Sequence, residues 1–133
     1  MNLIVCIDDR GGMLFNRRRQ SSDRYVTERI LDMARDGRLL VNSYTAKLFP
    51  EDAVLRCEQP WEAAQTQDCC FVEDKDVTVA AAKADKIIVF HWNRKYPADL
   101  FFPMDVLAKR KLLHTEEFPG YSHAHITMEV YAR

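Results

Sequence analysis

Apolar runs separated by short polar turns divide the chain into strand-sized segments. Residues 2–7 are almost wholly apolar, as is typical of a strand covered on both faces of a sheet. Residues 69–72 and 86–91 have the same character, and residues 38–41 and 53–57 are predicted to be shorter strands. The pattern therefore predicts buried strands along the whole chain.

Helical segments are expected between these strands. Val26 and Ile30 have helical spacing, and a helix is predicted over residues 23–35, before the turn residues Asp36 and Gly37. Shorter helices are predicted from Ser43 or Thr45 up to Pro50, from Pro60 to Gln65, and over residues 77–84. This alternation indicates an α/β fold with three layers, in which a mostly parallel, mixed sheet lies between helices on both faces.

The last twelve residues are ambiguous. Ile126 and Val130 have helical spacing, and Ser122 could cap a helix, whereas Ile126, Met128 and Val130 also alternate as in a strand. No repeat, low-complexity tract or linker interrupts the chain. We therefore expect residues 1–133 to form one domain.

Composition and charge narrow the possible partners. The 133 residues are 47% apolar and carry a net charge of −1, which indicates neither a nucleic-acid nor a membrane partner. A chain of this size can bury roughly 68% of its unfolded surface, so one core needs no disulfide. The four cysteines lack metal-binding spacing. We expect them to be small core residues, and we expect the protein to be in a reducing, cytoplasmic compartment.

Two groups of residues could hold a metal ion. Asp8 and Asp9 follow the first strand, where paired acids can hold Mg²⁺ for phosphoryl transfer or hydrolysis. His123 and His125 are two residues apart and would share one face of a strand, as zinc ligands can. Neither group shows a complete ligand set, so no metal site is predicted, and a solvated turn is favoured for the acid pair.

Cationic and aromatic segments are the other candidates for ligand contact. Arg17, Arg18 and Arg19 precede the predicted start of a helix, and guanidinium groups together with helix amides can bind an anion. Trp92 and Tyr96 flank two cations in a loop, where they could stack on a base or form a homo-oligomer interface. In both cases a solvated or packed loop is the simpler alternative.

Residues 84–91, 98–103 and 122–133, together with the opening residues 3–8, resemble the dihydrofolate reductases in their order along the chain. The resemblance implies that fold, closed by an antiparallel C-terminal strand, and it places Asp23 near the catalytic carboxylate of the family. The chain is also similar to short bacterial proteins that often bear a ribonuclease Z label. The His-x-His-x-Asp-His motif of that enzyme is absent, because Ile126-Thr127-Met128 follows His125.

The resemblance also implies positions for cofactor phosphates. Thr45 matches the turn that receives them, but Asn42 and Ser43 stand where the family has Gly-Arg. After residues 69–72 the family has glycines that let backbone amides approach the pyrophosphate, whereas this chain has Glu73 and Asp74.

Two carboxylates at this position oppose the usual cofactor pose. A carboxylate about 4 Å from a phosphate is repelled by roughly 1 kcal/mol per charge pair even in water. NADPH in the usual pose is therefore not expected, although the cofactor itself stays unknown. Phe90 also replaces the polar residue that contacts the pterin in the family, so pterin recognition is not implied.

These observations favour four functions, in the following order. The first is a dihydrofolate reductase-like protein that binds a small anionic or heteroaromatic ligand without conventional NADPH use. This ligand would lie near Asp23, Thr45 and the loop of Arg17, Arg18 and Arg19. The second is an active reductase with an altered cofactor site and Asp23 as its proton donor. The third is a metal-dependent phosphodiesterase or ribonuclease using the Asp8 pair, and the fourth is an interaction module. The sequence names neither the ligand nor the oligomeric state.

Overall fold

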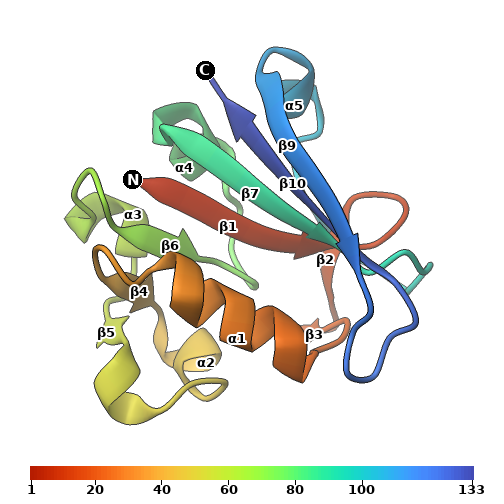
Figure 1. Ribbon diagram of the computed structural model, residues 1–133, viewed down its shortest axis with the longest axis horizontal. Helices are drawn as coiled ribbons and strands as arrows, with labels where there is room; N and C mark the ends of the chain where they lie inside the picture. The colour runs from red at the N-terminus through yellow and green to blue at the C-terminus, as the bar shows by residue number, and fades with distance from the viewer.

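The structure, a computed structural model, describes all 133 residues and is built around one large mixed sheet (Figure 1). Its seven strands lie in the order β5-β4-β6-β1-β7-β10-β9. They are β1 (Asn2–Ile7), β4 (Leu39–Val41), β5 (Leu55–Arg56), β6 (Cys69–Phe71), β7 (Lys86–His91), β9 (Lys111–Phe118) and β10 (Ile126–Ala132). The first five strands in this order run parallel, whereas β10 pairs antiparallel with both β7 and β9.

A second, small sheet and six short helical segments complete the fold. The small sheet has the order β3-β2-β8 and contains β2 (Gly12–Phe15), β3 (Arg18–Arg19) and β8 (Leu100–Phe101). The helices are α1 (Arg24–Met33), α2 (Ser43–Ala46), the 3-10 turn η1 (Glu51–Ala53), α3 (Pro60–Ala63), α4 (Thr78–Lys83) and α5 (Asp105–Ala108).

Helices α1 and α4 cover opposite faces of the large sheet. Val26 and Ile30 of α1 pack in one hydrophobic cluster with Ile4 of β1. Ala80 and Ala81 of α4 pack in a second cluster. To this cluster β1 contributes every second residue, Leu3, Val5 and Ile7. Because neighbouring side chains on a strand point to opposite faces, β1 is shared by both clusters and lies at the centre of the molecule.

The predicted α/β architecture is confirmed. The strand predicted over residues 2–7 is β1, that over 86–91 is β7, and the C-terminal segment forms the antiparallel strand β10. The helix predicted over 23–35 is α1, with Asp23 as its N-cap. No helix in the structure is both long enough and apolar enough to cross a membrane.

Several elements were not predicted: β2, β3, β8, the 3-10 turn η1, α5 and the eight-residue strand β9. The expectation that His123 and His125 share the face of a strand was wrong, because both precede β10 and lie in the loop before it. His123 lies in a bend and His125 in irregular backbone, and regular pairing begins only at Ile126, opposite Phe118.

Candidate functional site

Buried polar residues gather where β1 and β6 end, and Asp8 connects the loops that meet there. Its carboxylate accepts hydrogen bonds from the backbone N–H groups of Arg10, Gly12 and Tyr96, at 2.8–3.1 Å, and from the Gln20 amide at 3.2 Å. Burial alone would raise the pKa of Asp8, but these hydrogen bonds hold it below its ordinary value. Asp8 therefore acts as an anchor for three segments.

The acid pair does not assemble a metal site. Asp9, the neighbour of Asp8, is exposed to solvent. In the structure no three histidine, cysteine or acidic side chains come close enough together to hold a metal ion. His125 is exposed and lies 3.1 Å from Glu117, whereas His123 is buried, so the two histidines do not face a common site.

Glu73 lies at the centre of what we call the Glu73 cluster, formed by Arg19, Tyr44, Thr45 and Glu73. Arg19 binds the Glu73 carboxylate with two hydrogen bonds, from Nε to Oε2 at 2.9 Å and from Nη2 to Oε1 at 3.0 Å. The buried Thr45 hydroxyl donates to the same Oε1 at 2.8 Å. Arg19 also stacks over the Tyr44 ring, 4.6 Å from its centre. Both donors are therefore occupied by a carboxylate of the chain itself.

The second acid after β6 also has a partner inside the chain. Asp74 accepts a hydrogen bond of 2.7 Å from the Asn42 side-chain amide, and Asn42 in turn caps α2 by accepting from the Thr45 backbone N–H. The structure thus brings together Arg19, Thr45, Glu73 and Asp74, four of the residues singled out in the sequence. Arg17 and Arg18 do not join them: Arg17 lies in the turn between β2 and β3, Arg18 begins β3, and both are exposed.

Asp23 is buried at the start of α1, where it joins the helix to the loop before β10. It accepts hydrogen bonds from the backbone N–H groups of Tyr25, Tyr121 and Ser122, at 2.9–3.0 Å, and from Nδ1 of His123 at 2.8 Å. Burial alone would raise the pKa of Asp23, but these hydrogen bonds, led by that of Ser122, hold it well below its ordinary value. Asp23 is therefore an ionised carboxylate at neutral pH.

Around this carboxylate lies the His123 cluster, which consists of Ser21, Asp23, Trp92, Tyr96 and His123. Nε2 of His123 lies 2.8 Å from Oγ of Ser21 and 3.5 Å from the Tyr96 hydroxyl. The Trp92 ring stacks on the imidazole at a centroid distance of 4.8 Å and an interplanar angle of 24°. The imidazole is thus fixed on both nitrogens and on one ring face.

The predicted role of Trp92 in a subunit interface is limited by this packing. Trp92 is 4% exposed and lies against His123, so an interface in this region would rest on the exposed residues 93–95.

Next to the His123 cluster, the Oε1 atom of Gln20 is buried without a hydrogen-bond partner. Such an acceptor costs about 1–3 kcal/mol unless a ligand or water donates to it.

Cys6 of β1 is influenced by both clusters. Burial raises the pKa of its thiol well above the ordinary value, and the carboxylates of Glu73 and Asp23 raise it further. The thiol is therefore protonated at neutral pH, and Cys6, which is half-buried, packs as a small, uncharged side chain against the hydrophobic cluster that contains Ile4. This agrees with the expectation of a small core residue rather than a reactive thiolate.

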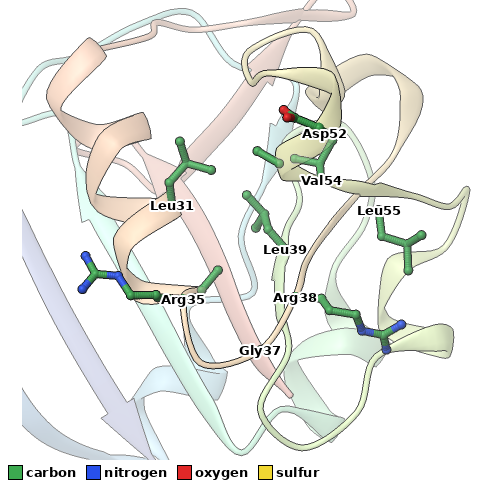
Figure 2. A pocket seen from close by; sticks show the side chains of 10 residues that line it. Leu31, Arg35, Gly37, Arg38, Leu39, Asp52, Val54 and Leu55 are labelled. Carbon is green, nitrogen blue, oxygen red and sulfur yellow. The ribbon is translucent and has the colours of Figure 1, made fainter.

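Two open grooves lie on the same side of the sheet as α1, away from the His123 cluster. One, of about 430 Å³, lies beside the end of α1, where Leu31, Leu39 and Val54 converge while the Arg35 guanidinium points away (Figure 2). The other, of about 290 Å³, runs along α2 and is lined by Ser43, Lys47, Phe49 and Arg56, among others. In this second groove neither Lys47 nor Arg56 forms an ion pair.

The fold is that of the dihydrofolate reductases. A solved structure of dihydrofolate reductase from Enterococcus faecalis, complexed with NADP(H) and RAB-propyl, matches 99% of this chain and 95% of its own chain with a TM-score of 0.71. Sequence identity over this match is 11%, so the likeness concerns the fold. No family model matches the sequence, and no curated protein matches it.

Sequence analysis singled out several residues that the structure places in these two clusters. Asp23, Thr45 and Glu73 were identified through the family resemblance, and the structure places all three in the two clusters. The contact of Ser21 with His123 was not predicted, because the two residues are 102 positions apart and the sequence suggested only a helix cap and a metal ligand for them. The available signal was a histidine directly after a serine, Ser122, in a polar loop.

Proposed function

We propose that this chain is a dihydrofolate reductase-like protein that binds a small anionic or heteroaromatic ligand and does not use NADPH in the usual pose. The proposal rests on the position of the Glu73 carboxylate, which binds both the Arg19 guanidinium and the Thr45 hydroxyl. The family resemblance assigns phosphate contacts to Thr45 and to the segment after β6. Here a carboxylate of the chain takes the place of the anion.

A diphosphate would have to displace Glu73 from both donors before it could bind there. Glu73 is 8% exposed, and its removal from Arg19 would break charge-assisted hydrogen bonds worth about 1.5–3 kcal/mol. The diphosphate would also approach Asp74, which adds repulsion of about 1 kcal/mol per charge pair at 4 Å in water. Both costs oppose the usual cofactor pose.

The groove along α2 supports binding of a small anion. Lys47 and Arg56 are exposed cations that form no ion pair, although Glu51 also lines the groove, and Phe49 provides an apolar wall. An anionic group would pair with these cations, while a flat ring would cover the apolar wall. The groove adjoins α2, the helix that carries Thr45. A ligand bound there would therefore lie near Thr45, one of the residues at which the sequence analysis predicts ligand binding.

The reductase alternative is less compatible with Asp23. A proton donor must be protonated at the working pH, whereas the hydrogen bonds to Asp23 hold its pKa well below the ordinary value. Phe90 is fully buried on β7, where the family has a polar side chain next to the pterin. We therefore favour ligand binding over hydride transfer to a pterin.

Calorimetric titration with NADPH tests the cofactor part of this proposal. The unmodified protein should show no micromolar binding, and Glu73→Gly should gain affinity because it frees Arg19 and Thr45. Lys75→Gly, in the same turn, controls for added backbone freedom and should behave like the unmodified protein. Micromolar binding of NADPH by the unmodified protein would overturn the proposal.

Titration with inorganic phosphate tests the ligand part. Replacing both Lys47 and Arg56 by Ala should weaken binding at least tenfold, whereas Lys86→Ala, an exposed lysine on β7, should leave it unchanged. Equal affinity in the double variant and the unmodified protein would show that the groove is not the anion site.

A further inference from the structure

Ser21, His123 and Asp23 form a continuous series of hydrogen bonds. The Ser21 hydroxyl lies 2.8 Å from Nε2 of His123, and Nδ1 of the same ring lies 2.8 Å from Oδ2 of Asp23. The loop before α1 supplies the serine and the aspartate, and the loop before β10 supplies the histidine. A carboxylate, an imidazole and a hydroxyl are thus joined in the order that serine hydrolases use on several unrelated folds.

The hydrogen-bond network assigns the protons along this series. An ionised Asp23 only accepts hydrogen bonds, so Nδ1 of His123 carries a hydrogen and donates it to the carboxylate. In the tautomer with its single hydrogen on Nδ1, Nε2 holds a lone pair, to which the Ser21 hydroxyl donates. This arrangement places a general base next to a nucleophile before any substrate binds.

Packing holds the base in place. His123 and Asp23 are 6% and 3% exposed, and Trp92 covers one face of the imidazole. Ser21 itself is only half-buried, unlike His123 and Asp23. A helix cap alone requires neither the imidazole nor the serine, because Asp23 already caps α1 through the Tyr25 backbone N–H.

We propose that Ser21 and His123 are a nucleophile and its general base, positioned by Asp23, and that they hydrolyse small carboxylic esters. This activity goes beyond the ligand binding proposed above and does not depend on it. Ser21 and His123 take no part in the Glu73 cluster or in the groove along α2.

The reaction needs only water as its second substrate. Oγ of Ser21 attacks the ester carbonyl carbon as its proton moves to Nε2 of His123, and the resulting intermediate expels the alcohol, which takes that proton. Water then attacks the acyl group on Ser21, gives a proton to Nε2, and releases the acid as the proton returns to Oγ. The sum is ester plus water to acid plus alcohol, with no change in oxidation state.

Tyr96 is placed to stabilise the oxyanion that forms in this reaction. Its hydroxyl lies 3.5 Å from Nε2 of His123, too far for a strong hydrogen bond to the ring. The hydroxyl hydrogen is therefore free to point at a carbonyl oxygen whose carbon is bonded to Ser21. Loss of one such donor typically slows an acyl transfer by about 10²–10³-fold.

Labelling with a fluorophosphonate probe tests the proposal on the whole chain. The Ser21 oxygen should displace fluoride from phosphorus, and mass spectrometry of peptides should find the phosphonyl group on Ser21. Ser21→Ala should abolish labelling, while Ser22→Ala, the neighbouring exposed serine, should label at the unmodified rate. An unlabelled wild-type protein, or a label that persists in Ser21→Ala, would overturn the proposal.

Hydrolysis of p-nitrophenyl acetate separates the roles of the other residues. His123→Gln should lower kcat by about 100-fold or more, and Tyr96→Phe should also lower it. Asp23→Asn should lower kcat while KM stays within about twofold, because one acceptor oxygen becomes an NH2 group and the residue no longer holds His123 in the tautomer with its hydrogen on Nδ1. Circular dichroism checks that each variant is folded. If one of these variants is unfolded, the comparison of Ser21→Ala with the unmodified protein still tests the proposal. Hydrolysis at the same rate in Ser21→Ala as in the unmodified protein would also refute the proposal.

Discussion

Each buried carboxylate in the site has a partner from a distant part of the chain. Glu73 binds Arg19, 54 positions away, and Asp23 binds His123, 100 positions away. A buried ionised group without a partner is costly, so such pairs fix which loops must lie together. At the residue scale, the same groups that determine the chemistry of the site also hold its loops in place.

The ionisation of Asp23 makes stability depend on acidity. Its folded-state pKa lies below the ordinary value of 3.8, so its contribution is complete above that pH and is lost as the pH falls further. We expect the free energy of unfolding of the wild-type protein to exceed that of Asp23→Asn by about 1–3 kcal/mol at pH 6. Urea unfolding at a series of pH values should show this difference shrinking below pH 4. Asp9→Asn, at an exposed carboxylate, is the control, and a difference that stays constant down to pH 2 would contradict the prediction.

Glu73 should contribute to stability through its charge. Glu73→Gln keeps the shape of the side chain and a contact with Thr45 but removes the charge that Arg19 binds. We expect a loss of about 1–2 kcal/mol in the free energy of unfolding, measured in urea at neutral pH. Glu58→Gln, at an exposed residue without a partner, should change it by less than about 0.5 kcal/mol. A neutral effect of Glu73→Gln would mean that the ion pair is worth no more than a surface pair.

At the element scale, the start of α1 and the loop before β10 form one unit. Asp23 caps α1 through Tyr25 and also accepts from the backbone of Tyr121 and Ser122. The loop comes this close because of Gly120, where a Cβ atom would lie 2.7 Å from Oδ2 of Asp23 and 2.9 Å from the His123 carbonyl oxygen. The absence of a side chain at Gly120 therefore brings His123 into contact with Asp23.

Gly120→Ala should loosen this unit and the chemistry built on it. The added methyl group must push the loop away from Asp23, so we expect a loss of about 1–3 kcal/mol in stability and slower fluorophosphonate labelling of Ser21. Ala124→Ser, at an exposed position of the same loop, is the control for both measurements. Unchanged labelling in a destabilised Gly120→Ala variant would indicate that the loop position does not govern the base.

The elements that were predicted from sequence are those with a strong burial pattern. β1 and β7 are apolar throughout and were placed correctly, whereas β9 was missed because seven of its eight residues are exposed or half-buried on the sheet edge. Leu112 and Leu113 within it are 46% and 49% exposed, so neither alternation nor a continuous buried run marks this strand. Its pairing with β10 is a tertiary contact that the pattern of the segment itself does not carry.

In the site, too, local features were predicted from the sequence, whereas contacts between distant segments were not. The resemblance to the dihydrofolate reductases, together with the position of Glu73 directly after a buried strand, predicted a carboxylate at the phosphate position. Its bonds with Arg19 and Thr45, and the contact of Ser21 with His123, depend on how distant loops fold over the sheet edge. The sequence and the family resemblance therefore singled out Arg19, Thr45 and Glu73, but they predicted neither Tyr44 nor the ion pair between Arg19 and Glu73.

At the scale of the whole molecule, the two hydrophobic clusters share the strands of one sheet. β1 gives Ile4 to the cluster beneath α1 and Leu3, Val5 and Ile7 to the cluster beneath α4. Loss of either helix layer would expose one face of the same central strand. Neither layer can therefore lose its packing without weakening the other, which predicts a single cooperative unfolding transition.

The two tryptophans allow this prediction to be tested, because one belongs to each face. Trp61 packs against the cluster beneath α4, and Trp92 is part of the cluster beneath α1. Trp61→Phe and Trp92→Phe each leave one fluorescent reporter, and within each variant the urea midpoint from fluorescence should equal that from far-UV circular dichroism. Comparison within one variant removes the effect of the substitution on overall stability. A fluorescence midpoint well below the dichroism midpoint, in either variant, would show that one layer separates first and that the chain does not unfold as one domain.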